Sequence, residues 1–191
     1  MAGKTLEGIM RKKVQLAPMA KEVQTIYKLI VLYLLDCVEF PLTNGQICEF
    51  ILEEQYTDYF TIQQTLTEML EMGLLEKEVI RNTSNYTMTE SGKETLTLLQ
   101  DEISDGIKAD TIKYLKANKF RLREENAVVA DYCNNENEGY TVKLQVKERQ
   151  NPIIDLTLEV PIERQAILFC DNWKKKSSQI YQYLMKELME K

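Results

Sequence analysis

The segment Tyr59–Leu75 carries polar side chains that could hydrogen-bond to the edges of DNA bases. Its sequence is YFTIQQTLTEMLEMGLL. At helical spacing its apolar side chains share one face: Ile62, Leu66, Met69 and Leu70. The remaining surface then presents neutral hydrogen-bonding groups, and a glutamine can bind adenine through two hydrogen bonds. The predicted base-contacting residues are Thr61, Gln63, Gln64 and Thr67.

Two glutamates on the same predicted helix favour a different interpretation. Glu68 and Glu71 follow the polar residues by one to two turns, and Tyr59–Leu75 contains no lysine or arginine. Phosphates repel carboxylates, although Glu68 could accept a hydrogen bond from a cytosine amine. The simpler interpretation is the solvated face of a structural helix. The segment could therefore contact bases, but it adds no electrostatic affinity.

Affinity for DNA would have to come from cations outside this helix. The net charge is −6, and most of the acidic excess lies in the first hundred residues. Candidate phosphate contacts are Lys28 and the Arg11–Lys13 cluster. A strand and turn farther along supply the other candidate DNA contacts: Lys77, Arg81, Asn82 and Asn85. Neutralising so few phosphates gives weak, salt-sensitive binding, so a homodimer is close to a requirement for this function.

The elements that would position these residues begin with three predicted helices. The first spans residues 21–40 and ends before Pro41. Capping boxes at Thr43–Gln46 and Thr61–Gln64 predict the starts of the second and third helices, and Gly73 ends the third. A strand over Leu74–Ile80, a turn over Arg81–Asn85, a strand over Tyr86–Met88 and a helix capped by Thr89 follow. This order is typical of a winged helix-turn-helix.

The second half of the chain predicts a small α+β domain. A helix over residues 105–119 follows a polar hinge near Gln100–Asp105. One strand ends in Ala127–Cys133, and two more alternate apolar and polar residues around Tyr140–Val146 and Ile154–Val160. The apolar face of this three-stranded antiparallel sheet is expected under a final helix over residues 162–188, with a stripe of Ala166, Ile167, Cys170, Trp173, Ile180, Tyr181 and Leu184. The predicted domains are an arm (1–20), a winged helix-turn-helix (21–100) and the α+β domain (101–191).

Other classes of function have little support in the composition. The chain has no histidine, its four cysteines include no C-x-x-C pair, and no phosphate-binding glycine motif occurs. We therefore expect no enzyme activity, metal or cofactor. The longest apolar run, Leu29–Leu35, is too short to span a bilayer, and the N-terminus does not resemble a signal peptide. A cytoplasmic protein without membrane contact is expected.

Several strings carry a likeness to a known family: PLTNGQICEFILEEQYTDYFTIQQTLTEMLEMGLL, YTMTESGKETL, ADYC and FCDNWKKKSSQIY. Together they resemble a bacterial family of uncharacterised winged-helix proteins, catalogued as a domain of unknown function (DUF). The string TESG is more loosely similar to PadR- and MarR-like repressors, which are dimers. The resemblance implies a winged-helix first half and an α+β second half, and it implies no activity, ligand or functional residue.

Two hypotheses follow. The first is a homodimeric DNA-binding transcription regulator whose second half supplies dimer contacts or an effector site. The alternative is a protein–protein interaction module whose winged helix does not bind DNA, which the acidic first half favours. Aromatic residues of the second half could line a ligand pocket, although at this spacing they are more often core: Tyr132, Tyr140, Trp173, Tyr181 and Tyr183.

Overall fold

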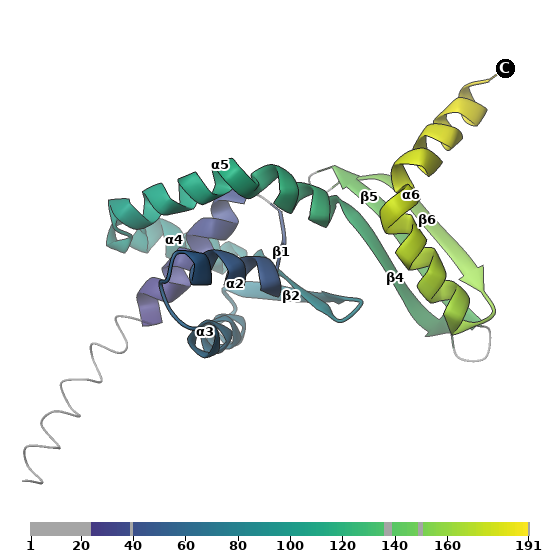
Figure 1. The fold of residues 1–191 in the computed structure, drawn as a ribbon. Coiled ribbons are helices and arrows are strands. Elements are labelled where there is room, and N and C mark those ends of the chain that lie inside the picture. The colour runs from purple at the N-terminus through teal and green to yellow at the C-terminus, as the bar shows by residue number, and fades with distance from the viewer. Residues whose placement is uncertain (1–23, 39, 136–138, 149–150, 191) are drawn as a thin grey trace, which may run out of the picture. The chain divides into compact units, whose positions relative to one another are not determined.

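The computed structural model describes residues 24–38, 40–135, 139–148 and 151–190 (Figure 1). They form two compact units, and neither is continuous in sequence. Unit 1 contains the described residues up to Cys37 together with Ile47–Glu76 and Met88–Leu115. Unit 2 contains Val38–Gln46, Lys77–Thr87 and the described residues from Lys116 onward. The predicted arm, with its Arg11–Lys13 cluster, lies outside the described residues, and the predicted domain boundaries remain predictions.

Unit 1 is helical, and its core is formed by aliphatic side chains at helical spacing. A helix over residues 24–38 is buried on most sides, as its wide apolar stripe predicts. The other helices are α2 (Asn44–Glu53), α3 (Tyr59–Glu71), α4 (Glu90–Leu99) and α5 (Asp105–Ala127), with a short 3-10 turn η1 (Gln100–Glu102). Helix α5 starts where predicted but continues to Ala127. The side chains buried in unit 1 include Leu29, Ile30, Leu32, Phe50, Ile51, Ile62, Leu66 and Met69.

The ends of these helices follow local side-chain chemistry. The first capping box is confirmed: the backbone N–H of Thr43 donates to Gln46 Oε1 at 2.9 Å, and that of Gln46 donates to Thr43 Oγ1 at 3.2 Å. The second is wrong, because α3 begins at Tyr59 and its cap is Asp58, whose carboxylate accepts from two backbone N–H groups. The positive end of the helix dipole stabilises a carboxylate, so Asp58 is a stronger N-terminal cap than Thr61.

Two further predicted caps are confirmed. Gly73, with a φ of 69°, ends α3 through hydrogen bonds from Gly73 N to Leu70 O and from Leu74 N to Met69 O. This pair of bonds is a Schellman motif, which needs the left-handed backbone that glycine adopts easily. Thr89 caps α4 by accepting from the backbone N–H of Gly92 at 3.0 Å.

The first sheet has three short strands in the order β1-β3-β2. They are β1 (Leu42–Thr43), β2 (Leu75–Ile80) and β3 (Thr83–Met88). The turn between β2 and β3 has only two residues, Arg81 and Asn82, with φ values of 45° and 63°. Positive φ at both positions is the geometry of a type I′ hairpin. The predicted turn over Arg81–Asn85 was therefore too long, because β3 starts at Thr83 and pairs Asn85 with Thr43.

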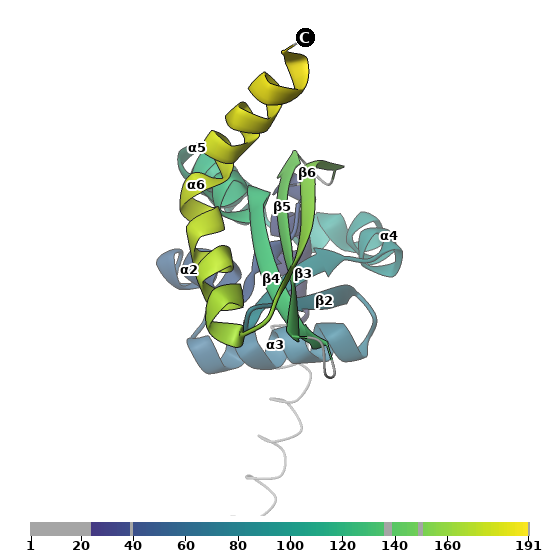
Figure 2. The same cartoon turned by 90° about the vertical axis from the view of Figure 1, so that its right-hand side faces the viewer.

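The second sheet lies in unit 2 and has the predicted three antiparallel strands under a long helix. Its strands are β4 (Val128–Asn135), β5 (Gly139–Glu148) and β6 (Asn151–Val160), in the order β4-β5-β6. Helix α6 (Glu163–Met189) crosses one face of the sheet (Figure 2). The core beneath it contains Ala130, Val142, Leu144, Val160, Ala166, Cys170 and Trp173. The α+β class is therefore confirmed.

Helix α6 covers this sheet unevenly. Trp173 is 1% exposed and donates from Nε1 to the backbone carbonyl of Gln145 at 3.0 Å, which ties the helix to β5. Leu158, on the edge strand β6, remains 39% exposed, and Ile167, which we expected inside, is 36% exposed. The prediction for Ile167 was wrong because the buried stripe runs through Ala166, Cys170, Trp173 and Ser177, and Ile167 lies beside it.

Candidate functional site

The first two predicted base-contacting residues are engaged within unit 1. Thr61 is half-buried, and its hydroxyl donates to Asp58 Oδ2 at 2.8 Å. Gln63 is also half-buried, and its Nε2 lies 3.1 Å from the sulfur of Cys48. Burial raises the pKa of the Cys48 thiol, and the hydrogen bond from Gln63 opposes that shift. Contact with a base would require Thr61 and Gln63 to exchange these internal partners.

The other two predicted contacts on α3 are exposed. Thr67 donates from its hydroxyl to the carbonyl of Gln63 at 2.9 Å, a bond made along the helix itself. Gln64 donates to Glu68 Oε1 at 3.0 Å, and Glu68 also forms a 2.8 Å ion pair with Lys28. The hydrogen bond from Lys28 is the main cause that lowers the pKa of Glu68, and the one from Gln64 adds to it. Lys28, a candidate phosphate contact, is therefore already paired with a carboxylate.

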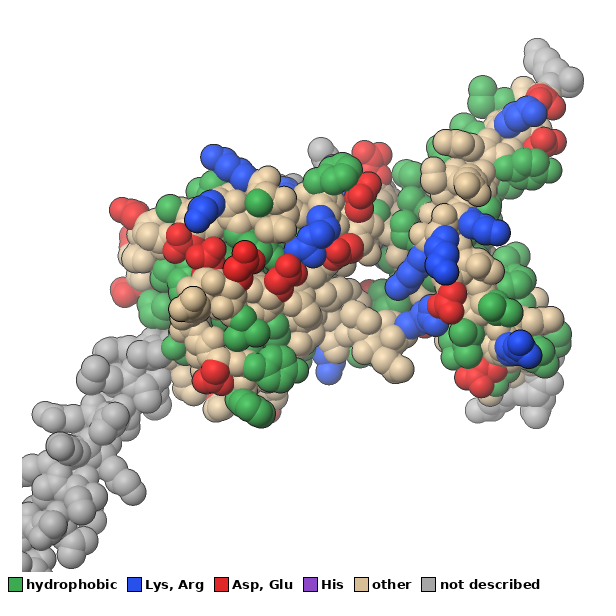
Figure 3. All heavy atoms as spheres, viewed as in Figure 1, with side chains coloured by type: hydrophobic (Ala, Val, Ile, Leu, Met, Phe, Trp, Pro, Cys, Tyr) green, Lys and Arg blue, Asp and Glu red, His purple; other side chains and the backbone are tan. Residues whose placement is uncertain are grey.

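The start of α3 presents aromatic side chains that the sequence interpretation passed over. Phe60 is 83% exposed and Tyr59 is 50% exposed, and their rings meet edge to face with centroids 6.0 Å apart. In Figure 3 hydrophobic side chains gather at α3 on the face in view. Asp58 is exposed just before them. This end of α3 is therefore apolar and acidic.

The remaining four predicted contacts lie on the β2–β3 hairpin, in unit 2. Lys77 and Asn82 are exposed, and Asn85 is half-buried and donates to the carbonyl of Thr83 at 3.2 Å. Arg81 makes a 2.8 Å ion pair with Asp171 of α6. That hydrogen bond raises the pKa of Arg81 and lowers the pKa of Asp171. The hairpin thus offers Lys77 and Asn82 to a partner, while a carboxylate holds Arg81.

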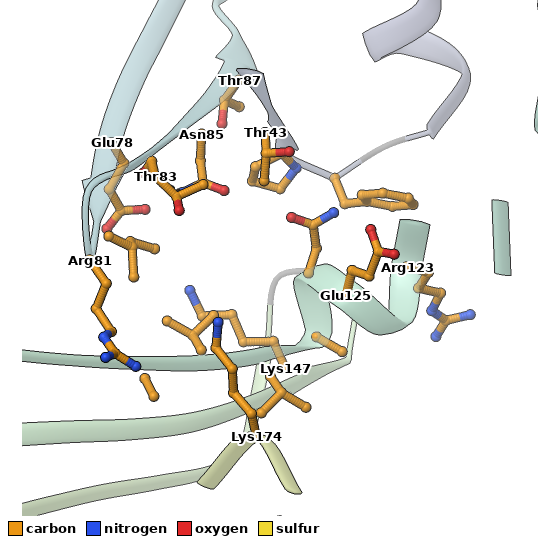
Figure 4. A pocket seen from close by; sticks show the side chains of 18 residues that line it. Thr43, Glu78, Arg81, Thr83, Asn85, Thr87, Arg123, Glu125, Lys147 and Lys174 are labelled. Atoms are coloured by element: carbon orange, nitrogen blue, oxygen red, sulfur yellow. Dashed lines mark hydrogen bonds between the residues drawn. The ribbon is translucent and has the colours of Figure 1, made fainter. Parts of the chain in front are cut away.

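A pocket of about 500 Å³ lies within unit 2, and every residue that lines it belongs to that unit (Figure 4). Its walls come from the hairpin, the segment around β1, the end of α5, the start of β4, and single residues of β5 and α6. The charged lining residues are Glu78, Arg81, Arg123, Glu125, Lys147 and Lys174. Thr43, Thr83, Asn85 and Thr87 add polar side chains, and Ile80, Val128 and Ala130 are among the apolar ones.

Three of the six charged residues that line the pocket have ionic or hydrogen-bond partners: Arg81, Arg123 and Glu125. Arg123 lies 3.4 Å from Glu148, and Glu125 accepts from Gln46 at 2.8 Å and from Arg121 at 3.3 Å. In Figure 4 the side chains of Lys147 and Lys174 extend into the pocket from the sheet and from α6. Neither lysine makes an ion pair with any residue that the structure describes. Two ammonium groups therefore face the cavity without a carboxylate partner there.

The sequence interpretation missed this pocket. In the sequence Lys147 occupies a polar position of an alternating strand, which is typical of a solvated face, and Lys174 belongs to a run of three lysines, which is typical of an exposed helix turn. Of the aromatics considered for a ligand site, Trp173 is core, and Tyr132 and Tyr140 contact each other with ring centroids 6.0 Å apart. None of the five aromatics lines the pocket. No sequence motif marks the site, because its walls come from five separate segments.

The protein is thus of the α+β class, with a helical unit, a second unit made of a sheet and a long helix, and a cavity lined partly by cations. The chain belongs to the family described as Domain of unknown function (DUF4364), which it matches over residues 27–188. No curated protein and no solved structure matches the chain. Among the described residues no helix has the length and apolarity to span a bilayer, and no cluster of three potential metal-binding side chains occurs.

Proposed function

We propose that the protein is a homodimeric DNA-binding transcription regulator that contacts DNA through α3 and the β2–β3 hairpin. The observation that carries the proposal is the connectivity. A helix, the strand β1, the helices α2 and α3, and the hairpin follow one another, and β1 lies beside β3 in the sheet. This connectivity supports a winged helix-turn-helix, a motif in which the second helix enters the major groove.

The chemistry of the exposed residues defines how such a protein would bind. Gln64 and Thr67 are exposed on α3 and can hydrogen-bond to base edges once Gln64 leaves Glu68. Lys77 and Asn82 are exposed on the hairpin, where a cation and an amide can contact phosphates. One copy neutralises few phosphates, so its affinity falls steeply with salt. Two copies double both kinds of contact, which is why the proposal includes a homodimer.

The end of α6 supplies a surface for a second copy. Apolar side chains recur there at helical spacing, through Tyr181, Leu184, Met185 and Leu188. Tyr181 and Leu184 are half-buried, Met185 is 42% exposed and Leu188 is 81% exposed. In Figure 1 the last turns of α6 extend beyond the sheet that its first turns cover. A matching stripe on a second copy would remove this apolar area from water.

The test is binding of the purified protein to the DNA upstream of its own coding sequence, followed by fluorescence anisotropy at about 50 mM and 200 mM salt. We expect binding at low salt that weakens steeply at the higher concentration, and tighter binding than to a scrambled duplex. Lys77→Glu should weaken binding to both duplexes. Lys143→Glu is the matched control, because Lys143 is an exposed strand lysine of unit 2 outside the hairpin. No salt-dependent signal at micromolar protein would remove the proposal.

A second candidate function is supported by the aromatic, acidic end of α3. Phe60 and Tyr59 expose large apolar surfaces, Asp58 is exposed beside them, and the sequence from Asp58 to Glu71 contains no lysine or arginine. Such a surface is complementary to a protein segment that combines apolar and basic residues. Under this alternative, Phe60→Ser abolishes co-purification of a specific partner and Leu98→Ser does not. Leu98, on α4, is 81% exposed and so matches Phe60 in exposure.

A further inference from the structure

We propose that the pocket of unit 2 binds a small organic anion, a carboxylate or phosphate compound with an apolar part. A cavity of about 500 Å³ has the size that proteins use for small-molecule ligands. Its lining combines cations, hydrogen-bonding groups and aliphatic side chains, which are the three components that such sites need.

The two lysines define the sign of the ligand. Lys147 comes from β5 and Lys174 from α6, and Figure 4 shows both side chains extending into the cavity. Neither lysine makes an ion pair within 4.0 Å of a described carboxylate, so an anion that enters the pocket can contact both ammonium groups without breaking such a pair. Lysine ammonium groups bind carboxylate and phosphate alike as point charges, so the lining selects for negative charge and leaves both chemistries open.

The opposite wall defines the rest of the ligand. Thr83, Asn85 and Thr87 project from β3, and Ile80, Val128 and Ala130 add aliphatic surface. Glu78 lies on the same side as the threonines and makes no ion pair with another described residue. A carboxylate can accept a hydrogen bond from a hydroxyl or amino group of the ligand. The best ligand therefore has an anionic end for the lysines and a hydrogen-bond donor for Glu78.

Arg81 connects the pocket to the hairpin. It forms part of the wall, and its guanidinium is held by Asp171, three residues before Lys174 on α6. A ligand that touches both the lysines and the hairpin stabilises the arrangement in which Arg81 is paired internally. Under the proposed function, this keeps a cation from DNA phosphates, so the ligand lowers DNA affinity, and by linkage DNA lowers ligand affinity. This regulatory step rests on the proposed function, whereas ligand binding does not.

The binding test uses three probes of similar shape and different charge: phenyl phosphate, benzoate and benzylamine. Each is titrated into the full-length ¹⁵N-labelled protein and followed by NMR chemical shifts. We expect the two anions to bind, with shifts in β3, in β4 and around Lys174 in the middle of α6, and the cation not to bind. Lys147→Gln or Lys174→Gln should each weaken phenyl phosphate binding about tenfold. Lys175→Gln, next to Lys174 but absent from the pocket lining, should leave it unchanged.

Binding of benzylamine as tight as that of the anions would overturn the proposal. An equal loss of affinity in the Lys175→Gln protein, or shifts confined to other surfaces, would overturn it as well. For the regulatory step, the DNA titration is repeated with saturating phenyl phosphate, with the expectation of an affinity loss of about fivefold or more. If the anion binds and DNA affinity stays the same, the coupling is wrong. If the protein binds the anion but never DNA, the proposed function fails while the pocket assignment stands.

Discussion

Lys28 Nζ lies 2.8 Å from Glu68 Oε2, so a lysine of the first helix neutralises the glutamate on the outer face of α3. The two side chains are 17% and 27% exposed, and Glu68 also accepts a hydrogen bond from Gln64. This contact changes the electrostatics of α3 in two opposing ways. Glu68 repels phosphates less than a bare carboxylate would, and Lys28 is no longer available to bind them.

The Lys28–Glu68 pair predicts a pH-dependent contribution to stability. The hydrogen bonds from Lys28 and Gln64 lower the pKa of Glu68 from its ordinary 4.5. A lowered carboxyl pKa stabilises the fold above about pH 4.5, and this contribution disappears as the pH falls below that value. Glu68→Gln should therefore reduce the free energy of unfolding by up to about 1 kcal/mol at neutral pH and have little effect near pH 3.

Urea denaturation of both proteins at the two pH values measures this difference. Glu71→Gln is the control, because Glu71 is exposed on the same helix and forms no ion pair with a described residue. An equal loss for Glu68→Gln at both pH values would show that the charge of Glu68 is not the cause.

The Arg81–Asp171 pair predicts a gain of function. Asp171→Asn removes the carboxylate that holds Arg81 and frees a cation on the hairpin turn. If the hairpin contacts DNA, affinity should rise severalfold at low salt, and the salt dependence should become steeper by about one phosphate contact. Fluorescence anisotropy at several salt concentrations gives both quantities.

Asp155→Asn is the matched control for this gain, because it removes the same charge from unit 2. Asp155 accepts a hydrogen bond from Gln145 at 2.7 Å on the sheet and lies away from the pocket lining. Equal gains in both variants would mean that net charge alone is responsible, and the hairpin assignment would then lose its support.

Gly92 predicts a large stability effect in unit 1. It is buried in α4, and a Cβ there would overlap the carbonyl oxygen of Leu74 and lie 2.8 Å from Met88 Cγ. The backbone oxygen cannot move without distorting the end of α3, so Gly92→Ala should destabilise the protein by roughly 2 kcal/mol or more. Gly106→Ala, in the first turn of α5, has no atom closer than 3.7 Å to its Cβ. It should be neutral or stabilise by up to about 1 kcal/mol, since alanine favours helix.

Thermal or urea denaturation compares the two alanine variants directly. Equal stabilities for Gly92→Ala and Gly106→Ala would mean that the close approach at Gly92 does not exist in solution.

The exposed end of α6 predicts the oligomeric state. Leu188→Glu places a charge in the apolar stripe and should convert a homodimer into a monomer, as measured by sedimentation velocity. Leu98→Glu introduces the same charge at a side chain of equal exposure, 81%, on α4 and should leave the dimer intact. A wild-type protein that sediments as a monomer at all concentrations, or dissociation by both variants, would exclude this surface as the dimer contact.

The sequence predicted local features well because the interacting groups lie close in the chain. The capping box of Thr43 and Gln46 spans three residues, and Gly73 and Thr89 were recognised as caps for the same reason. The start of α3 was misplaced because Asp58 and Thr61 are both good caps, and the extended backbone at Asp58, with a ψ of 168°, decides between them. The stripe of α6 was right at Trp173 and wrong at Ile167, since periodicity alone does not determine where a sheet ends beneath a helix.

The sequence by itself determined the α+β class, the order of the helices and of every strand except the two-residue β1, and the three-stranded sheet with its long helix, because each depends on the period of apolar residues and on short-range hydrogen bonds. Only the tertiary structure decided which polar groups are free. Arg81 meets Asp171 across 90 residues, and Lys28 meets Glu68 across two helices. Lys147 and Lys174 reach one cavity from β5 and α6. Such pairings depend on how separate elements pack, and no local pattern of residues encodes that packing.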